Sequence, residues 1–227
     1  NLKQLGQAVS PHSYRILKKD CLDLPEKSFV KREVELSDEQ KRAYVEMKAN
    51  ATTILKGQSA TALNVLTQLI RLHQITCGHM KTDDGEIINL KNSRLDELMQ
   101  ILGETTGKVI IWANYVHDIL NIERAIKNEY GPNSYCTYYG ATKSEDRQKC
   151  IKKFQEASNP IRFFIGNTQT GGYGITLTEA STVIYYSNNY DLEKRIQSED
   201  RAHRIGQKNP VLYIDLVAKG TVDEKII

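Results

Sequence analysis

The chain has 227 residues, of which 40% are apolar, and its 31 basic and 28 acidic side chains leave a formal net charge of +3. A nearly balanced charge does not by itself indicate a nucleic-acid partner, although basic residues can still cluster locally. The sequence contains neither an apolar run of about 18 residues nor a basic-then-apolar leader, so we expect no membrane span, no secretion, and an intracellular location in the cytoplasm or nucleus.

The cysteines lie far apart in the sequence and form no CxxC pair. Closely spaced cysteines are typical of disulfide-rich secreted domains and of zinc sites. We therefore expect a reducing compartment and neither a disulfide framework nor a zinc site. The four residues concerned are Cys21, Cys77, Cys136 and Cys150.

Residues 1–92 are mostly polar, and their patterns predict one strand and two helices. The strand covers residues 29–36, where apolar and polar side chains alternate. One helix covers residues 37–56, with Ser37 as N-cap and Gln40 completing a capping box. The second helix covers residues 60–76, and we expect the two helices to pack on each other. The apolar side of the second helix is predicted to consist of Leu63, Leu66, Leu69, Ile70 and Ile75.

From residue 93 onward, short β-rich runs alternate with helical patterns. Such alternation is typical of βαβ units with right-handed crossovers, and it predicts an α/β fold with a doubly wound, mostly parallel sheet covered by helices on both faces. We therefore divide the chain into a helical subdomain at residues 1–92 and an α/β lobe at residues 93–227. The predicted strands are 108–113, 134–139, 161–166, 182–187 and 211–217, and the helices between them are 93–104, 115–129, 144–157 and one that begins at residue 191.

A glycine-rich loop, "TQTGGYGITLTEA", follows the predicted strand 161–166. Ligands of such sheets bind at the carboxyl ends of the strands. Gly171, Gly172 and Gly174 allow close backbone approach, and exposed N–H groups at a strand-to-helix turn can bind phosphate. The spacing matches neither the phosphate-loop nor the dinucleotide fingerprint. A tight turn that requires glycine explains the pattern equally well.

The segment "QSEDRAHRIGQ" covers residues 197–207. In a helix that starts at residue 191 and ends at Gly206, the side chains of Gln197, Arg201 and Arg204 share one stripe because they lie at i, i+4 and i+7. Two guanidiniums on one face form a planar donor surface for phosphate. The alternative is a solvated helix with salt bridges. We expect this helix to end at the carboxyl edge of the sheet or beside it.

The segment "YYGATKSEDR" also follows a predicted strand. Gly140 turns the chain, and Thr142 is expected to cap the next helix in a capping box. The free N–H groups of the helix start, together with Lys143 and Arg147, suit a nucleic-acid phosphate. An ordinary helix start is the simpler alternative.

Several segments resemble the motifs of one enzyme family. "QSEDRAHRIGQ" resembles motif VI of the SWI/SNF-type ATPases, the DNA translocase and remodeller group of helicase superfamily 2, "KVIIWANY" resembles their motif IV, and "TQTGGYGITLTEASTVIYY" is similar to their motif V. "LDLPEKSFVKREVELSDEQKRAY" resembles the segment that leads into the second lobe of the family, and "SRLDEL" and "KGTVDEKI" also fit. The matches follow the family order over nearly the whole chain. One departure is "NNYDLEKR", which stands where the family usually has Trp-Asn-Pro.

The chain contains no GKT-type phosphate loop and no Asp-Glu-x-His box. In the family, both lie on the first RecA-like lobe. The resemblance therefore implies that this chain is the second RecA-like lobe, together with the helical insertion that the family places near the start of that lobe. Thr221 and Glu224 suggest a capping box close to the end of the chain, so we expect a longer protein.

The resemblance also implies ATP hydrolysis between two lobes, with ATP and Mg²⁺ held mainly by the N-terminal lobe of the same protein. Arg201 and Arg204 would be arginine fingers that neutralise charge on the γ-phosphoryl group. Gln197, Gly172 and Gly174 would contact the nucleotide. This chain alone is expected to hydrolyse no ATP. The backbone of double-stranded DNA would be held by Gly140, Thr142, Lys143, Arg147, Thr168 and Thr170.

Two other functions fit part of the sequence. A non-catalytic RecA-like module that binds DNA or a protein would keep the basic loops, but it would not need Gln197 and two arginines on one stripe. A nucleotide-cofactor enzyme would use "GGYG" as a dinucleotide loop, with Asp191 about 20 positions after Gly171. The GxGxxG pattern is missing, and the loop follows the third predicted strand of the lobe rather than the first.

Overall fold

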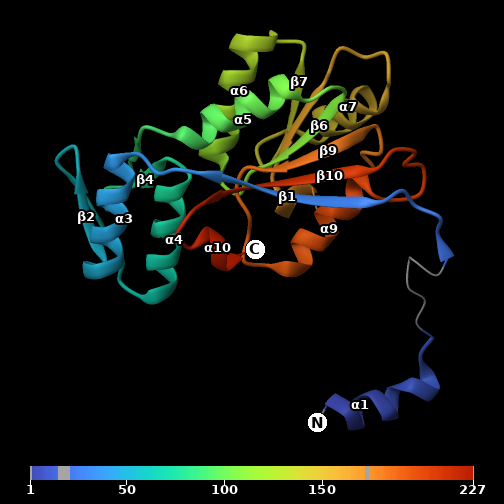
Figure 1. Cartoon of the computed structure of the whole chain (residues 1–227), viewed down its shortest axis with the longest axis horizontal. Helices are drawn as coiled ribbons and strands as arrows, with labels where there is room; N and C mark the ends of the chain where they lie inside the picture. Colours follow the sequence, from blue (N-terminus) through green and yellow to red (C-terminus); the bar gives the residue numbers. More distant parts are fainter. Residues whose placement is uncertain (1, 15–20, 172–173, 227) are drawn as a thin grey trace.

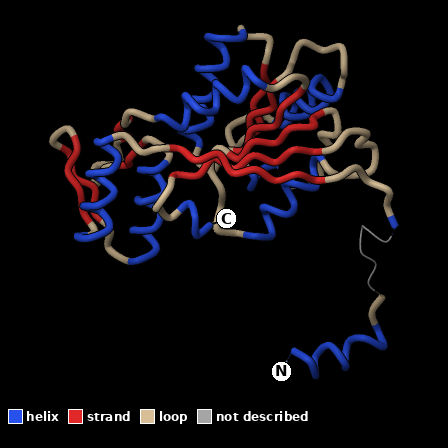
Figure 2. Tube along the Cα trace, in the orientation of Figure 1, coloured by secondary structure: helices blue, strands red, loops and turns tan. Residues whose placement is uncertain are grey.

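A six-stranded sheet forms the centre of the computed structural model, which describes residues 2–14, 21–171 and 174–226 (Figures 1 and 2). The strand order is β1-β10-β9-β6-β8-β7, and neighbouring strands pair in parallel throughout. The strands are β1 Lys27–Val34, β6 Lys108–Trp112, β7 Tyr135–Tyr138, β8 Phe163–Gly166, β9 Ala180–Tyr185 and β10 Val211–Ala218.

Helices cover both faces of this sheet. α5 (Ser93–Glu104) and α6 (Val116–Tyr130) pack on one face, and α7 (Ser144–Gln155) and α9 (Leu192–Ala202) pack on the other. In β6, Val109 faces α5 and α6 while Ile110 faces the opposite core. All five residues of β6 are buried, as expected for a central strand that is covered on both faces. The structure thus confirms the predicted doubly wound α/β fold.

The strand in the first region belongs to this sheet. β1 pairs with β10 along its whole length, from Lys27 opposite Val211 to Val34 opposite Ala218. The predicted boundary at residue 92 therefore does not separate the sheet from the residues before it. The alternating pattern of this segment identifies a strand, but it contains no information about which strand lies beside it.

The helical part inserted between β1 and α5 contains two helices and two hairpins. The capping box is confirmed, because Ser37 Oγ accepts from the N–H of Gln40 and Gln40 Oε1 accepts from the N–H of Ser37. Gln40 Nε2 also donates to the carbonyl of Ile75 at 2.7 Å, which joins the two helices as predicted. The elements are α3 Asp38–Asn50, β2 Thr52–Leu55, β3 Gln58–Thr61, α4 Val65–Thr76, β4 His79–Lys81 and β5 Ile87–Asn89.

The first predicted helix is shorter than the sequence suggested. It ends at Asn50, and Ala51 adopts the left-handed conformation with φ 55°. Residues 52–55 form a hairpin with residues 58–61, and Lys56 and Gly57 make its turn with φ of 50° and 78°. The β-branched run Thr-Thr-Ile and a turn with two positive φ angles favour a hairpin over a further helical turn.

The predicted apolar side of the second helix is wrong in its first half. Leu63, Leu66 and Ile70 are 91%, 68% and 41% exposed, whereas Leu72 and Ile75 are buried. α4 begins only at Val65, and only its carboxyl-terminal turns pack against α3 and β4. Helical periodicity gave the spacing of the apolar residues but not the part of the helix that the neighbouring elements cover.

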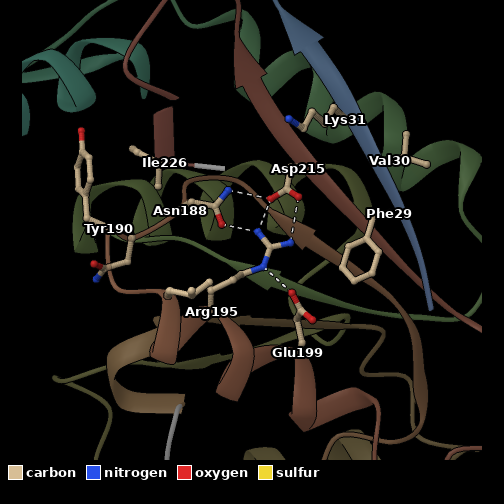
Figure 3. Close-up of a pocket in the computed structure, with 11 residues that line it drawn as sticks. Phe29, Val30, Lys31, Asn188, Tyr190, Arg195, Glu199, Asp215 and Ile226 are labelled. Carbon is tan, nitrogen blue, oxygen red and sulfur yellow. Dashed lines mark hydrogen bonds and ion pairs between the residues drawn. The ribbon is translucent and has the colours of Figure 1, made fainter. Parts of the chain in front are cut away.

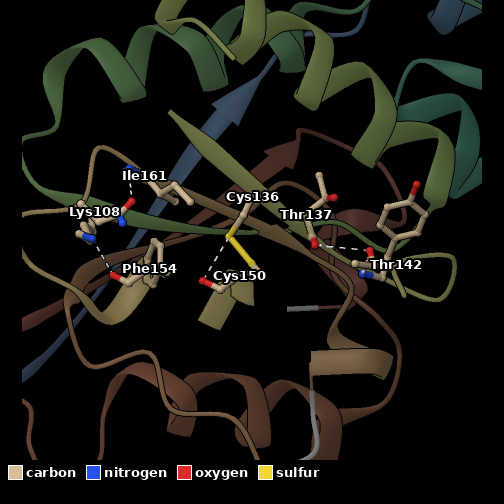
Figure 4. The surroundings of a disulfide bond; sticks show 9 residues. Lys108, Cys136, Thr137, Thr142, Cys150, Phe154 and Ile161 are labelled. Carbon is tan, nitrogen blue, oxygen red and sulfur yellow. Dashed lines mark hydrogen bonds between the residues drawn. A yellow bond between two sulfur atoms is a disulfide. The ribbon is translucent and has the colours of Figure 1, made fainter. Parts of the chain in front are cut away.

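A disulfide joins Cys136 on β7 to Cys150 on α7 (Figure 4), although the wide spacing of the cysteines led us to expect no disulfide framework. The two Cα atoms lie 5.7 Å apart, although the residues are 14 positions apart in the sequence. α7 returns along the strand it follows and packs on it, so the two side chains meet. The spacing of cysteines in a sequence cannot show such a contact before the crossover is known. Among the described residues, Cys21 and Cys77 are free.

Reduction of this disulfide is expected to lower the free energy of unfolding by about 2–3 kcal/mol, because the bond restricts the unfolded chain within a short loop. Urea denaturation with and without dithiothreitol measures the difference. Cys150→Ser should unfold identically in both conditions. Cys21→Ser should keep the dithiothreitol effect because Cys21 is exposed and unpaired. Equal unfolding curves for the oxidised and reduced wild-type protein would contradict the prediction.

The remaining described elements are short. α1 (Leu2–Val9) and a 3-10 turn (Ser10–His12) precede the sheet, α8 (Thr168–Gly171) follows β8, and α10 (Asp223–Ile226) follows β10. Figure 1 draws α1 apart from the rest of the chain. Within the described ranges, no helix has the length and apolar character needed to cross a membrane.

Candidate functional site

The helix α9, which carries the first part of "QSEDRAHRIGQ", begins at the carboxyl edge of the sheet and ends at the amino edge. Its N-cap is Asp191, whose Oδ1 accepts from the N–H of Lys194 at 3.3 Å. Past the end of the helix, Gln207 Nε2 donates to the carbonyls of Thr178 and Ala180 at 3.0 and 2.9 Å. Because Ala180 is the first residue of β9, the expectation that this helix ends at the carboxyl edge is wrong.

Arg201 and Arg204 come together although only Arg201 lies on the helix. α9 ends at Ala202, so the predicted helix through Gly206 is too long. Nevertheless, Nη1 of both arginines donates to the carbonyl of Ile175, at 3.4 and 3.2 Å. Burial, followed by the positive charge of Arg204, lowers the pKa of Arg201. The two guanidiniums thus lie close together, with the carboxylate of Asp200 in the same hollow.

The arginine pair lines a hollow of about 270 Å³ together with Leu22, Asp200 and Ile205. Gln197 lies one turn before Arg201 on α9, as predicted, and its Nε2 donates to Glu193 Oε1 at 2.8 Å. The side chain of Gln197 is half-buried, so its amide lies at the surface of the helix rather than in the core.

The glycine-rich loop begins with a sharp turn after β8. Asn167 holds this turn, because its Nδ2 donates to the carbonyl of Asn114 at 2.7 Å and its Oδ1 accepts from the N–H of Gln169 at 2.7 Å. Thr168 is buried, with 4% exposed, whereas Thr170 is half-buried. Gly174 has a positive φ of 68°, a backbone conformation that residues with a side chain rarely adopt. Gly172 lies outside the described residues.

The loop between β7 and α7 differs from the predicted capping box. α7 begins at Ser144 with Lys143 as N-cap, and Thr142 does not cap it. The hydroxyl of Thr142 instead donates to the carbonyl of Thr137 at 3.4 Å and accepts from the N–H of Tyr139 at 3.3 Å. The helix starts at Ser144 as predicted, but Thr142 stabilises the preceding turn instead of capping the helix.

Arg147 holds the same loop from α7. Its Nη2 donates to the carbonyls of Tyr139 and Gly140, both at 2.9 Å, and its guanidinium lies over the ring of Tyr138. Gly140 and Lys143 are exposed. Lys143 also lines an open groove of about 500 Å³, beside Lys149 and Lys153. The loop therefore presents the ammonium group of Lys143 to solvent at a helix start without a side-chain cap, while Lys149 on α7 pairs with Asp146.

Two candidate regions that carry basic side chains thus lie at opposite edges of one sheet. The arginine pair sits at the amino edge, where Gln207 contacts the start of β9. The loops after β7 and β8 sit at the carboxyl edge. Among the described residues, no group of three His, Cys, Asp or Glu side chains is arranged to hold a metal ion.

Comparison with known proteins identifies the family. Residues 90–206 match the family described as helicase conserved C-terminal domain. The chain belongs to this family. Its sheet, its helices on both faces and its order of motifs are those of the C-terminal RecA-like lobe of a SWI/SNF-type superfamily 2 ATPase.

Curated relatives of this helicase lobe are longer than the chain. It is 30% identical over 246 residues to the human SWI/SNF-related matrix-associated actin-dependent regulator of chromatin subfamily A member 1, a match that covers the whole chain and 23% of the relative. The chain spans less than a quarter of the length of the curated relatives that it matches first.

Solved structures agree with this assignment. The Sulfolobus solfataricus SWI2/SNF2 ATPase C-terminal domain is 25% identical with a TM-score of 0.61, over 88% of this chain and 83% of that one. The core of the same enzyme, solved in complex with dsDNA, is 25% identical with a TM-score of 0.63, over 100% of this chain and 49% of that one.

Two buried polar clusters of the helicase lobe were not predicted from the sequence. One surrounds Arg195 and Asp215 (Figure 3), and the other joins Arg94 to Asp223. A signal for the first was present, because Asp215 interrupts the apolar strand "VLYIDLV", and a buried carboxylate requires a partner. The partner itself could not be identified without the tertiary structure.

The second cluster joins the helical insertion to the carboxyl edge of the sheet. His79 on β4 lies 3.0 Å from Asp118 on α6, measured from Nδ1 to Oδ1. His73 on α4 contacts Tyr115, whose hydroxyl lies 3.0 Å from Nδ1. His73 Nε2 is 3.9 Å from Asp223, but burial lowers the pKa of His73 to about 4, so this ring is neutral at pH 7.

Buried His73 is expected to make the stability of the helicase lobe depend on pH. Because its pKa is lower in the folded state than in the unfolded state, its contribution is complete above pH 6.5 and is lost as the pH falls towards 4. The loss amounts to about 3 kcal/mol at most. Urea denaturation between pH 7 and pH 5 measures it. His73→Asn should flatten the dependence and His12→Asn, at an exposed position, should not. An unchanged slope in His73→Asn would refute this role.

Proposed function

We propose that this chain is the second motor lobe of an ATP-dependent, double-stranded DNA translocase of the SWI/SNF type, and that Arg201 and Arg204 are its arginine fingers. The observation that carries the proposal is the convergence of both guanidiniums on the carbonyl of Ile175 at the amino edge of the sheet. Both guanidiniums share one contact at one edge of the sheet, as two side chains that act on the same phosphoryl group would require. The location at the end of α9 leaves the pair accessible to a second lobe.

The proposed chemistry needs little from this chain besides position and charge. In phosphoryl transfer, negative charge spreads over the oxygens of the transferring group, and guanidinium forks stabilise it. ATP and Mg²⁺ would be held mainly by the N-terminal lobe. Arg201 and Arg204 would approach the γ-phosphate when the cleft closes. Gln197, Gly172 and Gly174 would complete the nucleotide contacts.

The proposed DNA contacts lie at the other edge of the lobe. The exposed Lys143 and the uncapped start of α7 suit a backbone phosphate, and Arg147 keeps Gly140 and its neighbours in place. Thr170, with Thr142 and Thr168 in supporting positions, would line the same path. The solved complex of a similar ATPase core with dsDNA supports double-stranded DNA as the partner. Separate edges for ATP and DNA would let closure around ATP shift the lobe along DNA.

The rest of the predicted organisation belongs to the same proposal. Residues 36–92 would act as the helical insertion of the motor, with β1 counted in the lobe. The longer protein would work inside the cell, in the cytoplasm or the nucleus. Its N-terminal RecA-like lobe would be the principal partner of this chain.

Activity measurements on the chain and on the longer protein test the proposal. The chain alone is expected to show no ATP hydrolysis above background, because its sequence contains no GKT-type phosphate loop and no Asp-Glu-x-His box. The longer protein should hydrolyse ATP, and DNA should stimulate it. Mutation-sensitive hydrolysis by the isolated chain would contradict the division of roles. A longer protein without any ATPase activity would favour a non-catalytic binding module.

A further inference from the structure

The guanidinium of Arg195 forms the centre of a dense polar cluster between α9 and β10 (Figure 3). It makes two parallel bonds to Asp215, from Nη1 to Oδ1 at 2.5 Å and from Nη2 to Oδ2 at 3.0 Å. Nη1 also donates to Asn188 Oδ1 at 2.6 Å, and Nε donates to Glu199 Oε1 at 2.9 Å. A fork geometry of this kind fixes orientation as well as distance.

The cluster connects three separate elements. Arg195 and Glu199 lie on α9, Asp215 lies in the middle of β10, and Asn188 follows β9. Asp215 is 3% exposed, so its charge is compensated only within the fold. Asn188 Nδ2 also donates to Asp215 Oδ1, at 2.8 Å. Removing the guanidinium would leave a buried carboxylate without its main partner.

The same cluster determines which face of α9 points at the sheet. The guanidinium carbon of Arg195 lies 3.6 Å from the centre of the Tyr185 ring. One turn later, Ser198 Oγ lies 2.7 Å from the hydroxyl of Tyr185, and Ala202 is fully buried. Residues 195, 198 and 202 therefore form the sheet-facing stripe, and the stripe with Gln197 and Arg201 lies on another side of the helix.

We propose that Arg195 is a positioning residue for the arginine pair: its bonds to Asp215 fix the rotation of α9 and thereby the direction in which Arg201 and Arg204 point. This inference rests on the proposed function of that pair. Arg195 itself lies more than one helical turn from Arg201, within the cluster, and need not touch the nucleotide.

Separate hydrogen bonds hold the carboxyl-terminal end of α9, so the loss of the Arg195 bonds can be tested without detaching the helix. Gln207 binds the carbonyls of Thr178, Ala180 and Ala202, and the N–H of Leu177 donates to the carbonyl of Arg201 at 2.9 Å. These bonds keep the helix attached when Arg195 is changed. Loss of the Arg195 fork should therefore rotate or tilt α9 rather than release it.

Steady-state kinetics of the longer protein test this role. Arg195→Lys keeps the charge but loses the fork, and it should lower kcat for ATP by roughly tenfold to a hundredfold while KM changes little. Asp215→Asn should give the same pattern, and it serves as the second variant if Arg195→Lys melts below the assay temperature. A matched control is Arg162→Lys, because Arg162 bonds the carbonyls of Leu102, Thr105 and Gly107 far from α9. Its kcat should match wild type.

A double-substitution experiment separates positioning from general structural damage. In a protein that already carries Arg201→Ala and Arg204→Ala, Arg195→Lys should cause no further fall in residual turnover, because residues that act as a unit are not additive. A fall by the same factor in both backgrounds would overturn the inference, as would an unchanged kcat in folded Arg195→Lys and Asp215→Asn. If Arg201→Ala and Arg204→Ala themselves keep wild-type rates, the proposed function fails and the inference falls with it.

Discussion

Replacing Arg201 or Arg204 by alanine in the longer protein is expected to lower ATP turnover by about three orders of magnitude or more, while ATP binding largely survives. Both side chains would act mainly on charge that develops during phosphoryl transfer, so their loss should appear in kcat rather than in KM. Lysine at either position should restore little, because an ammonium group lacks the planar fork of a guanidinium. ATPase kinetics and equilibrium nucleotide binding together measure the two effects.

An exposed arginine on the opposite face of the sheet provides the control. Arg124 lies on α6, which packs on the face away from α9, and Arg124→Ala should retain wild-type turnover. Wild-type rates in both Arg201→Ala and Arg204→Ala would show that the arginine pair has no part in catalysis. A large rise in KM at constant kcat would assign the pair to nucleotide binding instead.

Replacing Asp223 by alanine is expected to lower the free energy of unfolding by about 3–5 kcal/mol, because it leaves the charge of Arg94 buried without a counterion. Arg94 is 1% exposed, and Nη2 donates to Asp223 Oδ2. Nη1 donates to the carbonyls of Tyr186 and Leu216 at 2.6 and 3.1 Å. The dipoles of these two carbonyls alone do not neutralise the charge of Arg94. Although burial acts to raise it, the charge of Arg94 lowers the pKa of Asp223.

An exposed ion pair near Asp223 provides the control for this buried ion pair. Lys219 and Glu33 are 3.4 Å apart with side chains 72% and 65% exposed, so Lys219→Ala should change stability by less than about 0.5 kcal/mol. Urea denaturation of both variants measures the contrast. Replacing Arg94 by methionine together with Asp223→Ala should recover part of the loss, because no charge then remains buried. A loss below about 1 kcal/mol in Asp223→Ala would mean that solvent reaches Arg94.

The elements of the lobe could be predicted well where side-chain pattern and backbone preference agree. The run "KVIIW" becomes β6, buried on both faces, and Ser37 with Gln40 starts α3 as its capping box requires. Prediction failed where a local pattern had two solutions. Residues 52–56 continue a helical spacing of apolar residues, yet β-branched side chains and Gly57 place them in a hairpin.

In the candidate site, too, local patterns predicted some positions correctly and others wrongly. Arg201 and Gln197 share one side of α9 because the helical repeat places them there. Arg204 joins them by a different route, since the helix ends at Ala202 and the chain turns so that both arginines reach the carbonyl of Ile175. The edge of the sheet at which this happens was predicted wrongly. The correct edge follows from the predicted fold, because a helix that joins two parallel strands begins at the carboxyl edge of the sheet and returns to the amino edge.

The sequence by itself determined the fold class, the order of the motifs and the family, because these follow from local periodicity and from residues that are contiguous in the chain. Only the tertiary structure decided which distant residues meet. The pairing of β1 with β10, the disulfide between Cys136 and Cys150, and the fork from Arg195 to Asp215 each join segments whose closeness depends on how the crossovers pack. Such contacts are set by the burial of whole faces, and no short stretch of sequence specifies them.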